Sequence, residues 1–274
     1  MRLSISNIAW DPAEDEAIAA LLGERGIEAI DIAPGKYFPD PAAATDADIG
    51  RVRDWWKARG IEIVGMQSLL FGTTGLNMFG PPAVQDAMLA HLGAVCRIGG
   101  GLGATRLVFG SPKNRDRGSL GENEAVRQAL PFLARLGDLA AGCGVTVCLE
   151  PNPERYGANF MTTSAATAAV VAQAGHRAIR MQLDTGALAI NGEDPETELA
   201  HCAGLVGHVH ASEPDLVPLG DGGTAHAAMG AAVERHLPGH IVTVEMVATR
   251  GEPHVQSVAR ALDVAIRHYR EGRA

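Results

Sequence analysis

Three carboxylates and one imidazole stand at the ends of short apolar runs in the second half of the sequence. They are Glu150 in TVCLE (146–150), Asp184 in IRMQLD (179–184), His210 in LVGHVH (205–210) and Glu245 in IVTVE (241–245). Each run has the length and composition of a buried strand. Carboxylate oxygens and one imidazole nitrogen suit a divalent cation such as Mn²⁺, Mg²⁺ or Co²⁺, and Zn²⁺ or Fe²⁺ is also compatible with them.

The spacing of these four residues indicates how they could meet. They are separated by 34, 26 and 35 residues, about the length of one strand, one helix and two loops. A closed parallel barrel brings the C-terminal ends of all its strands to one rim, so residues far apart in sequence converge there. We therefore predict one metal site, whereas the simpler alternative is that acids and histidines at strand ends only bond neighbouring loops.

Strand-like and helical segments alternate along the whole chain. Further strand-like runs cover residues 3–10, 27–33, 61–66 and 105–110, and helical patterns separate all eight runs. This order predicts an α/β fold, a single-domain (β/α)₈ TIM barrel over residues 1–274. An open doubly wound sheet would gather its ligands at one crevice rather than on four successive strands. The run GGGLG (99–103) follows a helix and precedes a strand, which predicts a helix stop rather than a phosphate loop.

Composition limits the partners. The formal charge of −9 disfavours nucleic acid and anionic membrane surfaces, because both attract proteins through a positive field. We find no basic-plus-apolar leader and no apolar run of about 18 residues, which would be needed to span a membrane. The four cysteines form no CxxC pair, which is typical of reduced, buried thiols. These features predict a cytoplasmic protein that acts on a small molecule.

Other polar residues near the expected strand ends are candidates for contacts with that small molecule. Lysine and arginine donors suit hydroxyl, carboxylate or phosphate groups, and side chains behind the ligands can orient them. The predicted substrate contacts are Lys36, Lys113, Asn152, Arg155 and Glu213. His208 lies two residues before His210 on the same side of its strand, so we expect it, like Gln182, to support the metal ligands from behind.

Together these motifs resemble the sugar phosphate isomerase/epimerase family of xylose isomerase-like TIM barrels, which also includes ketose 3-epimerases, inosose dehydratase and the apurinic endonuclease IV. The resemblance rests on CLEPNP at Glu150, QLDTG at Asp184, GHVHASEP at His210 and VTVEM at Glu245. It implies one divalent ion, most often Mn²⁺, Mg²⁺ or Co²⁺, with Glu150 and Glu245 as the acid/base pair. It also implies a homodimer or homotetramer.

The family resemblance implies an enzyme of carbohydrate metabolism that isomerises or epimerises a small sugar, sugar acid or sugar phosphate. A proton next to the carbonyl would be removed to give a cis-enediolate, which a cation stabilises. The alternatives are a keto-polyol dehydratase, a sugar-binding barrel without turnover and an apurinic endonuclease. The sequence departs from the ketose 3-epimerases of the family, because QLDTGALAING has no histidine and SEPDLVPLG has no arginine.

Overall fold

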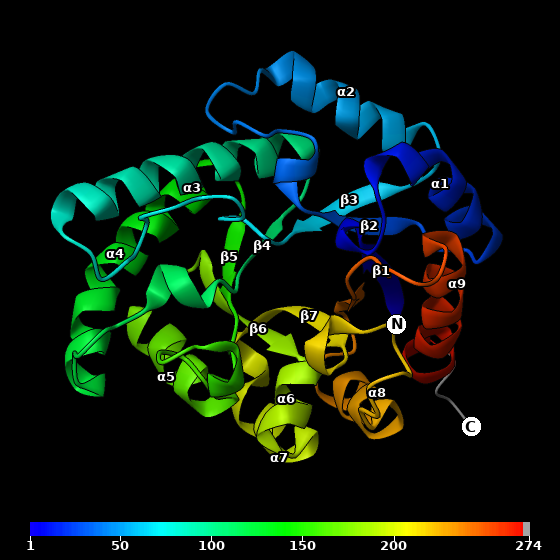
Figure 1. The fold of residues 1–274 in the computed structure, drawn as a ribbon. Coiled ribbons are helices and arrows are strands. Elements are labelled where there is room, and N and C mark those ends of the chain that lie inside the picture. Colours follow the sequence, from blue (N-terminus) through cyan, green and yellow to red (C-terminus); the bar gives the residue numbers. More distant parts are fainter. Residues whose placement is uncertain (271–274) are drawn as a thin grey trace.

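The computed structural model describes residues 1–270 and has eight parallel strands that close into a barrel (Figure 1). Each strand pairs with the next one along the chain, and the last pairs with the first. The strands are β1 (Arg2–Ser6), β2 (Ala29–Ile32), β3 (Glu62–Met66), β4 (Arg106–Phe109), β5 (Thr146–Leu149), β6 (Ile179–Asp184), β7 (Val206–Ser212) and β8 (Ile241–Glu245). The TIM barrel predicted from the alternating segments is confirmed.

Helices form a ring outside the strands, as Figure 1 shows. They are α1 (Asp15–Glu24), α2 (Asp46–Lys57), α3 (Pro82–Leu102), α4 (Glu122–Gly142), α5 (Ser164–Ala174), α6 (Thr185–Asn191), α7 (Pro195–Cys202), α8 (His226–His236) and α9 (His254–Ala265). None of the helices in this part of the chain is long and apolar enough to cross a membrane.

Local sequence signals explain several helix boundaries. Thr45 caps α2 and exchanges hydrogen bonds with Asp48, while Asp194 caps α7 just before a proline at the first helical position. The prediction that residues 99–103 stop a helix was wrong for most of that run. Helix α3 continues to Leu102, and it ends only where Gly103 adopts a φ of 85°. The glycines before it allow close packing, since a Cβ on Gly100 would lie 2.5 Å from a carbonyl oxygen of residue 143.

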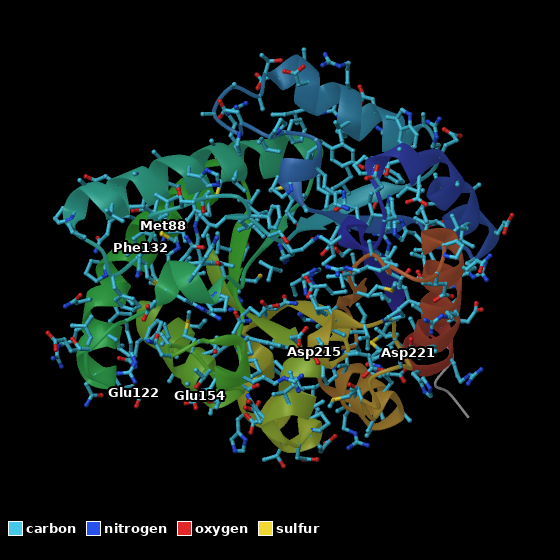
Figure 2. The ribbon with its side chains drawn as sticks, in the orientation of Figure 1. Met88, Glu122, Phe132, Glu154, Asp215 and Asp221 are labelled. Carbon is cyan, nitrogen blue, oxygen red and sulfur yellow. The ribbon has the colours of Figure 1, made fainter. Side chains whose placement is uncertain are left out.

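The apolar core lies mainly between the strands and the helix ring. Met88 of α3 and Phe132 of α4, labelled in Figure 2, are both almost fully buried on neighbouring helices. The interior of the barrel is different, because many of its inward-facing side chains are polar and buried. These are Ser4, Asp31, Gln182, His208, His210 and Thr243. Such polar groups need partners inside the barrel.

Candidate metal centre

Four neighbouring strands bring the candidate ligands to one rim. Glu150 directly follows β5, Asp184 and Glu245 end β6 and β8, and His210 lies in β7. Asp184 is paired in register with His210. One ligand atom from each of the four residues can be chosen so that all lie within 4.8 Å of one another. The structure therefore brings together the set whose convergence the strand spacing predicted.

His210 has a buried ring that faces these carboxylates. Its Nδ1 lies 3.1 Å from Glu245 Oε2 and 3.7 Å from Glu150 Oε1. Within residues 1–270 neither ring nitrogen has a hydrogen-bond partner of acceptable geometry, although the residue is 0% exposed. A buried polar atom without a hydrogen-bond partner is costly, and a cation coordinated by Nδ1 would satisfy it. The donor set therefore fits a divalent metal ion.

Electrostatics within the cluster support the same assignment. Burial raises the pKa of Asp184 to about 7, and the charges of Glu150 and Glu245 add to this shift. Burial acts to lower the pKa of His210, but Glu245, Asp31 and Glu150 outweigh it and raise the pKa well above its usual value. Crowded negative charge of this kind is relieved either by protons or by a cation.

Asp31 of β2, which the sequence analysis did not single out, lies behind the ligand cluster. Its Oδ2 is 2.6 Å from His208 Nε2 and 3.7 Å from His210 Nε2, and Ser4 donates a weak 3.4 Å hydrogen bond to Oδ1. Burial opposes its charge, yet the two histidines outweigh burial and lower the Asp31 pKa. The carboxylate thus bonds His208 and lies beside Nε2 of His210, the ring nitrogen that faces away from Glu150 and Glu245. The sequence offered one signal for this role, because Asp31 is a charged residue inside the otherwise apolar run 29–32.

Hydrogen bonds also fix the carboxylates. The Ser212 hydroxyl donates to Asp184 Oδ2 at 2.7 Å, and the backbone N–H of Ala187 donates to Asp184 Oδ1 at 2.6 Å. The Asn152 amide donates to Glu150 Oε2 at 3.1 Å. Arg115 is fully buried and donates to the backbone carbonyl of Glu150 at 2.6 Å, while burial lowers its pKa to about 10. Hydrogen bonds therefore orient the carboxylates of Asp184 and Glu150.

A cavity of about 610 Å³ opens above the cluster, between the loops that follow the strands. Glu150, Asp184 and Glu245 lie at its base, together with Lys113 and Asn152 on one side. Apolar side chains form much of its wall, namely Leu69, Leu70, Phe71, Val108, Phe109 and Leu216. Phe71 is 84% exposed at the entrance. The cavity can hold a small ligand with one oxygen-rich end facing the metal ligands.

The other residues predicted to contact substrate lie elsewhere. Lys36 does not line the cavity, because its ammonium donates to the backbone carbonyls of Asn7 and Trp10. Arg155 is half exposed and pairs with Asp215, a residue of the cavity wall labelled in Figure 2. The paired arginine lies outside the lining.

Glu213 is 1% exposed and faces the loop after β7 rather than the cavity. It accepts hydrogen bonds from the N–H groups of Gly220 and Thr224 and lies 3.1 Å from His226 Nε2. Burial acts to raise its pKa, but these bonds outweigh burial and lower it. Gln182 lies beside His208 in the barrel, and no protein group within the described residues bonds its side-chain amide.

Comparison with known proteins agrees with this fold. A family model for the xylose isomerase-like TIM barrel matches residues 17–268, and the chain belongs to that family. L-ribulose 3-epimerase of Mesorhizobium japonicum is 33% identical over 97 residues, or 35% of this chain. The aligned segment spans about a third (32%) of that relative's own length.

Solved structures show the same architecture over nearly the whole chain. D-psicose 3-epimerase of Clostridium cellulolyticum H10, solved with D-tagatose, superposes with a TM-score of 0.81 at 16% identity and covers 98% of this chain and 99% of its own. A structure of an L-ribulose 3-epimerase gives a TM-score of 0.80 at 19% identity, over 99% and 95% of the two chains. At these identities the likeness defines the fold alone.

Proposed function

We propose that the protein is a divalent-metal-dependent isomerase or epimerase of a small keto sugar. The observation that carries the proposal is the convergence of Glu150, Asp184, His210 and Glu245, the three acids of which line an open cavity. The relatives named above act on ketoses, which are the class of substrate that a hydroxy-ketone site of this kind would take. A bound cation would supply Lewis acidity to the oxygens of the substrate.

In the proposed mechanism, Glu150 and Glu245 move the proton next to the carbonyl. Glu150 directly follows β5, Glu245 ends β8, and both line the cavity. If one carboxylate removes the proton from one face of the ketose and the other donates a proton to the opposite face of the resulting enediolate, the substrate is epimerised. Return to the neighbouring carbon gives aldose–ketose isomerisation. Asn152 holds Glu150 in position for this step through its 3.1 Å hydrogen bond.

The charge of the cavity favours a neutral sugar over a phosphorylated one. Among the described residues of its lining, Lys113 is the single cation, whereas Glu150, Asp184, Asp215 and Glu245 are acidic. Lys113 already donates to the backbone carbonyl of Thr73 at 3.1 Å. A sugar phosphate would need two negative charges accommodated beside these acids, and like charges placed that close repel each other. We therefore propose an uncharged keto sugar.

Deuterium exchange from D₂O, followed by NMR, tests this function directly. Mn²⁺-loaded protein and an EDTA-treated sample would be incubated with ketoses, sugar acids and sugar phosphates. We expect metal-dependent exchange next to the carbonyl of a neutral ketose, with the position of the label separating epimerisation from isomerisation. Loss of water from the product would instead identify a dehydratase.

Two variants with a matched control connect the exchange to the proposed residues. Glu245→Gln should abolish exchange while the fold is retained, because the amide cannot accept the proton. Asp184→Ala should weaken Mn²⁺ binding as well. Glu122→Gln, at an exposed position on α4, should catalyse deuterium exchange into the substrate as fast as the unchanged protein does. Full exchange in Glu245→Gln would refute the assignment.

A further inference from the structure

A second cavity of about 610 Å³ lies at the opposite end of the barrel from the metal centre, at the N-terminal ends of the strands. Residues of β1, β3, β4, β5, β6, β7 and β8 and of the turns before three of them contribute to its lining. This end of a TIM barrel ordinarily serves stability, and bulky apolar side chains usually fill the barrel interior. Here the interior end is hollow and polar.

The lining is strongly cationic in a chain that carries a net charge of −9. Four arginines line the cavity, Arg2, Arg106, Arg177 and Arg180, and among the described lining residues Glu62 is the single carboxylate. Arg2 already pairs with Glu62 at 2.7 Å. Three guanidinium charges therefore share the cavity without a carboxylate partner from its own lining, and such a concentration of like charge attracts an anion.

The hydrogen bonds of these arginines leave donors available. Arg106 donates from Nε to the carbonyl of Gly207 at 2.9 Å and from Nη1 to the carbonyl of Thr105 at 3.1 Å. Arg180 donates from Nη2 to the carbonyl of Gly204. Each guanidinium has five N–H donors, so both side chains are fixed in place by the backbone while further N–H groups remain for a ligand.

Arg177 lies just before β6 and differs from its neighbours. It is exposed, and within residues 1–270 no acceptor is bonded to its guanidinium. It lines the same cavity as the two fixed arginines. A structural role in closing the barrel would account for Arg106 and Arg180, which bond strand and turn carbonyls, but it does not account for Arg177.

We propose that this cavity binds a small multivalent oxyanion, with the phosphate or diphosphate group of a metabolite as the chemical class. Planar guanidinium groups match the oxygens of phosphate through paired N–H donors. A bound oxyanion would offset the three unpaired positive charges and use the donors that the backbone leaves free. His208 also lines this cavity and bonds Asp31, whose Oδ2 lies 3.7 Å from His210 Nε2, so two buried polar side chains would separate the bound anion from His210 of the metal centre.

Isothermal titration of the full chain with pyrophosphate at low ionic strength tests the proposal. We expect saturable binding of one pyrophosphate per chain that weakens as salt is added, because screening reduces the attraction between charges. Arg177→Gln should bind about tenfold more weakly, which corresponds to ~1.4 kcal/mol. Because Arg177 bonds no described protein group, this variant should keep its fold. Arg180→Gln should also weaken binding, and Arg180→Lys should recover only part of it, because lysine keeps the charge but lacks the paired N–H donors.

Two controls distinguish binding in this cavity from binding elsewhere on the protein. Arg127→Gln removes the same charge from an exposed position on α4, outside the cavity lining, and should bind like the unchanged protein. Glu245→Gln, at the metal centre, should also bind normally. The proposal is overturned if the unchanged protein shows no saturable binding, or if Arg177→Gln and Arg127→Gln bind with equal affinity. Loss of binding only in Glu245→Gln would place the anion at the metal centre and also overturn it.

Discussion

Replacing Gly110 by alanine would place a methyl group against a candidate metal ligand. Gly110 follows β4, and a Cβ built on it would lie 1.8 Å from Glu150 Oε2. Ordinary van der Waals contact begins near 3.4 Å, so the carboxylate oxygen would have to move by about 1.6 Å. The backbone itself tolerates alanine, because φ at this position is not positive. The substitution therefore acts on the carboxylate more than on the fold.

The displacement can be compared with the tolerance of a metal site. Metal–ligand distances in proteins hold to within about 0.2 Å, so a shift of ~1.6 Å removes Glu150 from coordination or forces the site to rearrange. A misplacement of ~1 Å can cost about 100-fold in rate. We expect Gly110→Ala to weaken Mn²⁺ binding by at least about tenfold and to lower the rate of ketose exchange by about 100-fold or more.

Titration calorimetry with Mn²⁺ and deuterium exchange would measure these two effects, and thermal unfolding would show that the variant folds. Gly35→Ala is a matched control, because Gly35 follows β2 at the same end of the barrel and no heavy atom of the described residues lies within 4 Å of an added Cβ. Unchanged Mn²⁺ affinity and exchange in folded Gly110→Ala would refute the placement of Glu150 at the metal.

Three further predictions follow from burial and hydrogen bonding. Metal-free protein should lose stability as the pH rises from about 4 to 7. The pKa of Asp184 is raised to about 7 in the folded protein, so folded Asp184 still carries a proton that the unfolded chain has already released. The raised pKa of His210 extends this loss of stability above pH 6.5. Thermal unfolding should show Mn²⁺ reversing this slope, whereas a flat metal-free profile would contradict it. Phe132→Ala should lower the free energy of unfolding in urea by about 3–5 kcal/mol. The control Leu139→Ala, at a partly exposed position on the same helix, should lower it by less than ~1 kcal/mol. Equal losses in the two variants would contradict the packing of Phe132 in the core. Glu213→Gln should raise KM, and it should speed hydrogen exchange of the backbone amides of Gly220 and Thr224, which donate hydrogen bonds to this carboxylate. Unchanged amide exchange would show that the carboxylate does not hold the loop after β7.

The barrel and its rim residues were predictable because parallel strand order alone fixes them. Once eight β-α segments are recognised, the C-terminal ends of the strands share one rim, and Glu150, Asp184, His210 and Glu245 follow without knowledge of any side-chain contact. The metal that binds there and the roles of these residues stay predictions, as do the assembly state and a cytoplasmic location.

The residues behind and beside the site were harder to predict. Asp31 meets His208 across 177 residues, and register shifts between Ile30 and Asp31 and between Met181 and Gln182 change which side chains face the barrel axis. Alternation along a strand cannot reveal a bulge.

Loop residues pose a different problem, because a position after a strand does not set the direction of a side chain. Lys36 and Glu213 both follow strand ends, but neither side chain points into the cavity. Lys36 donates to a backbone carbonyl, and Glu213 accepts a hydrogen bond from a backbone N–H of its own loop. Only the distribution of unsatisfied N–H and C=O groups in the folded loops determines such choices.

The polar interior of the barrel has a consequence for engineering this protein. A column of buried side chains, Ser4, Asp31, His208 and His210, connects the arginine cavity at one end with the carboxylates at the other. Filling a barrel centre with branched aliphatic residues is a common route to thermostability. In this molecule that route would remove the support of His210, so thermostabilising substitutions belong in the layer between strands and helices, around Met88 and Phe132.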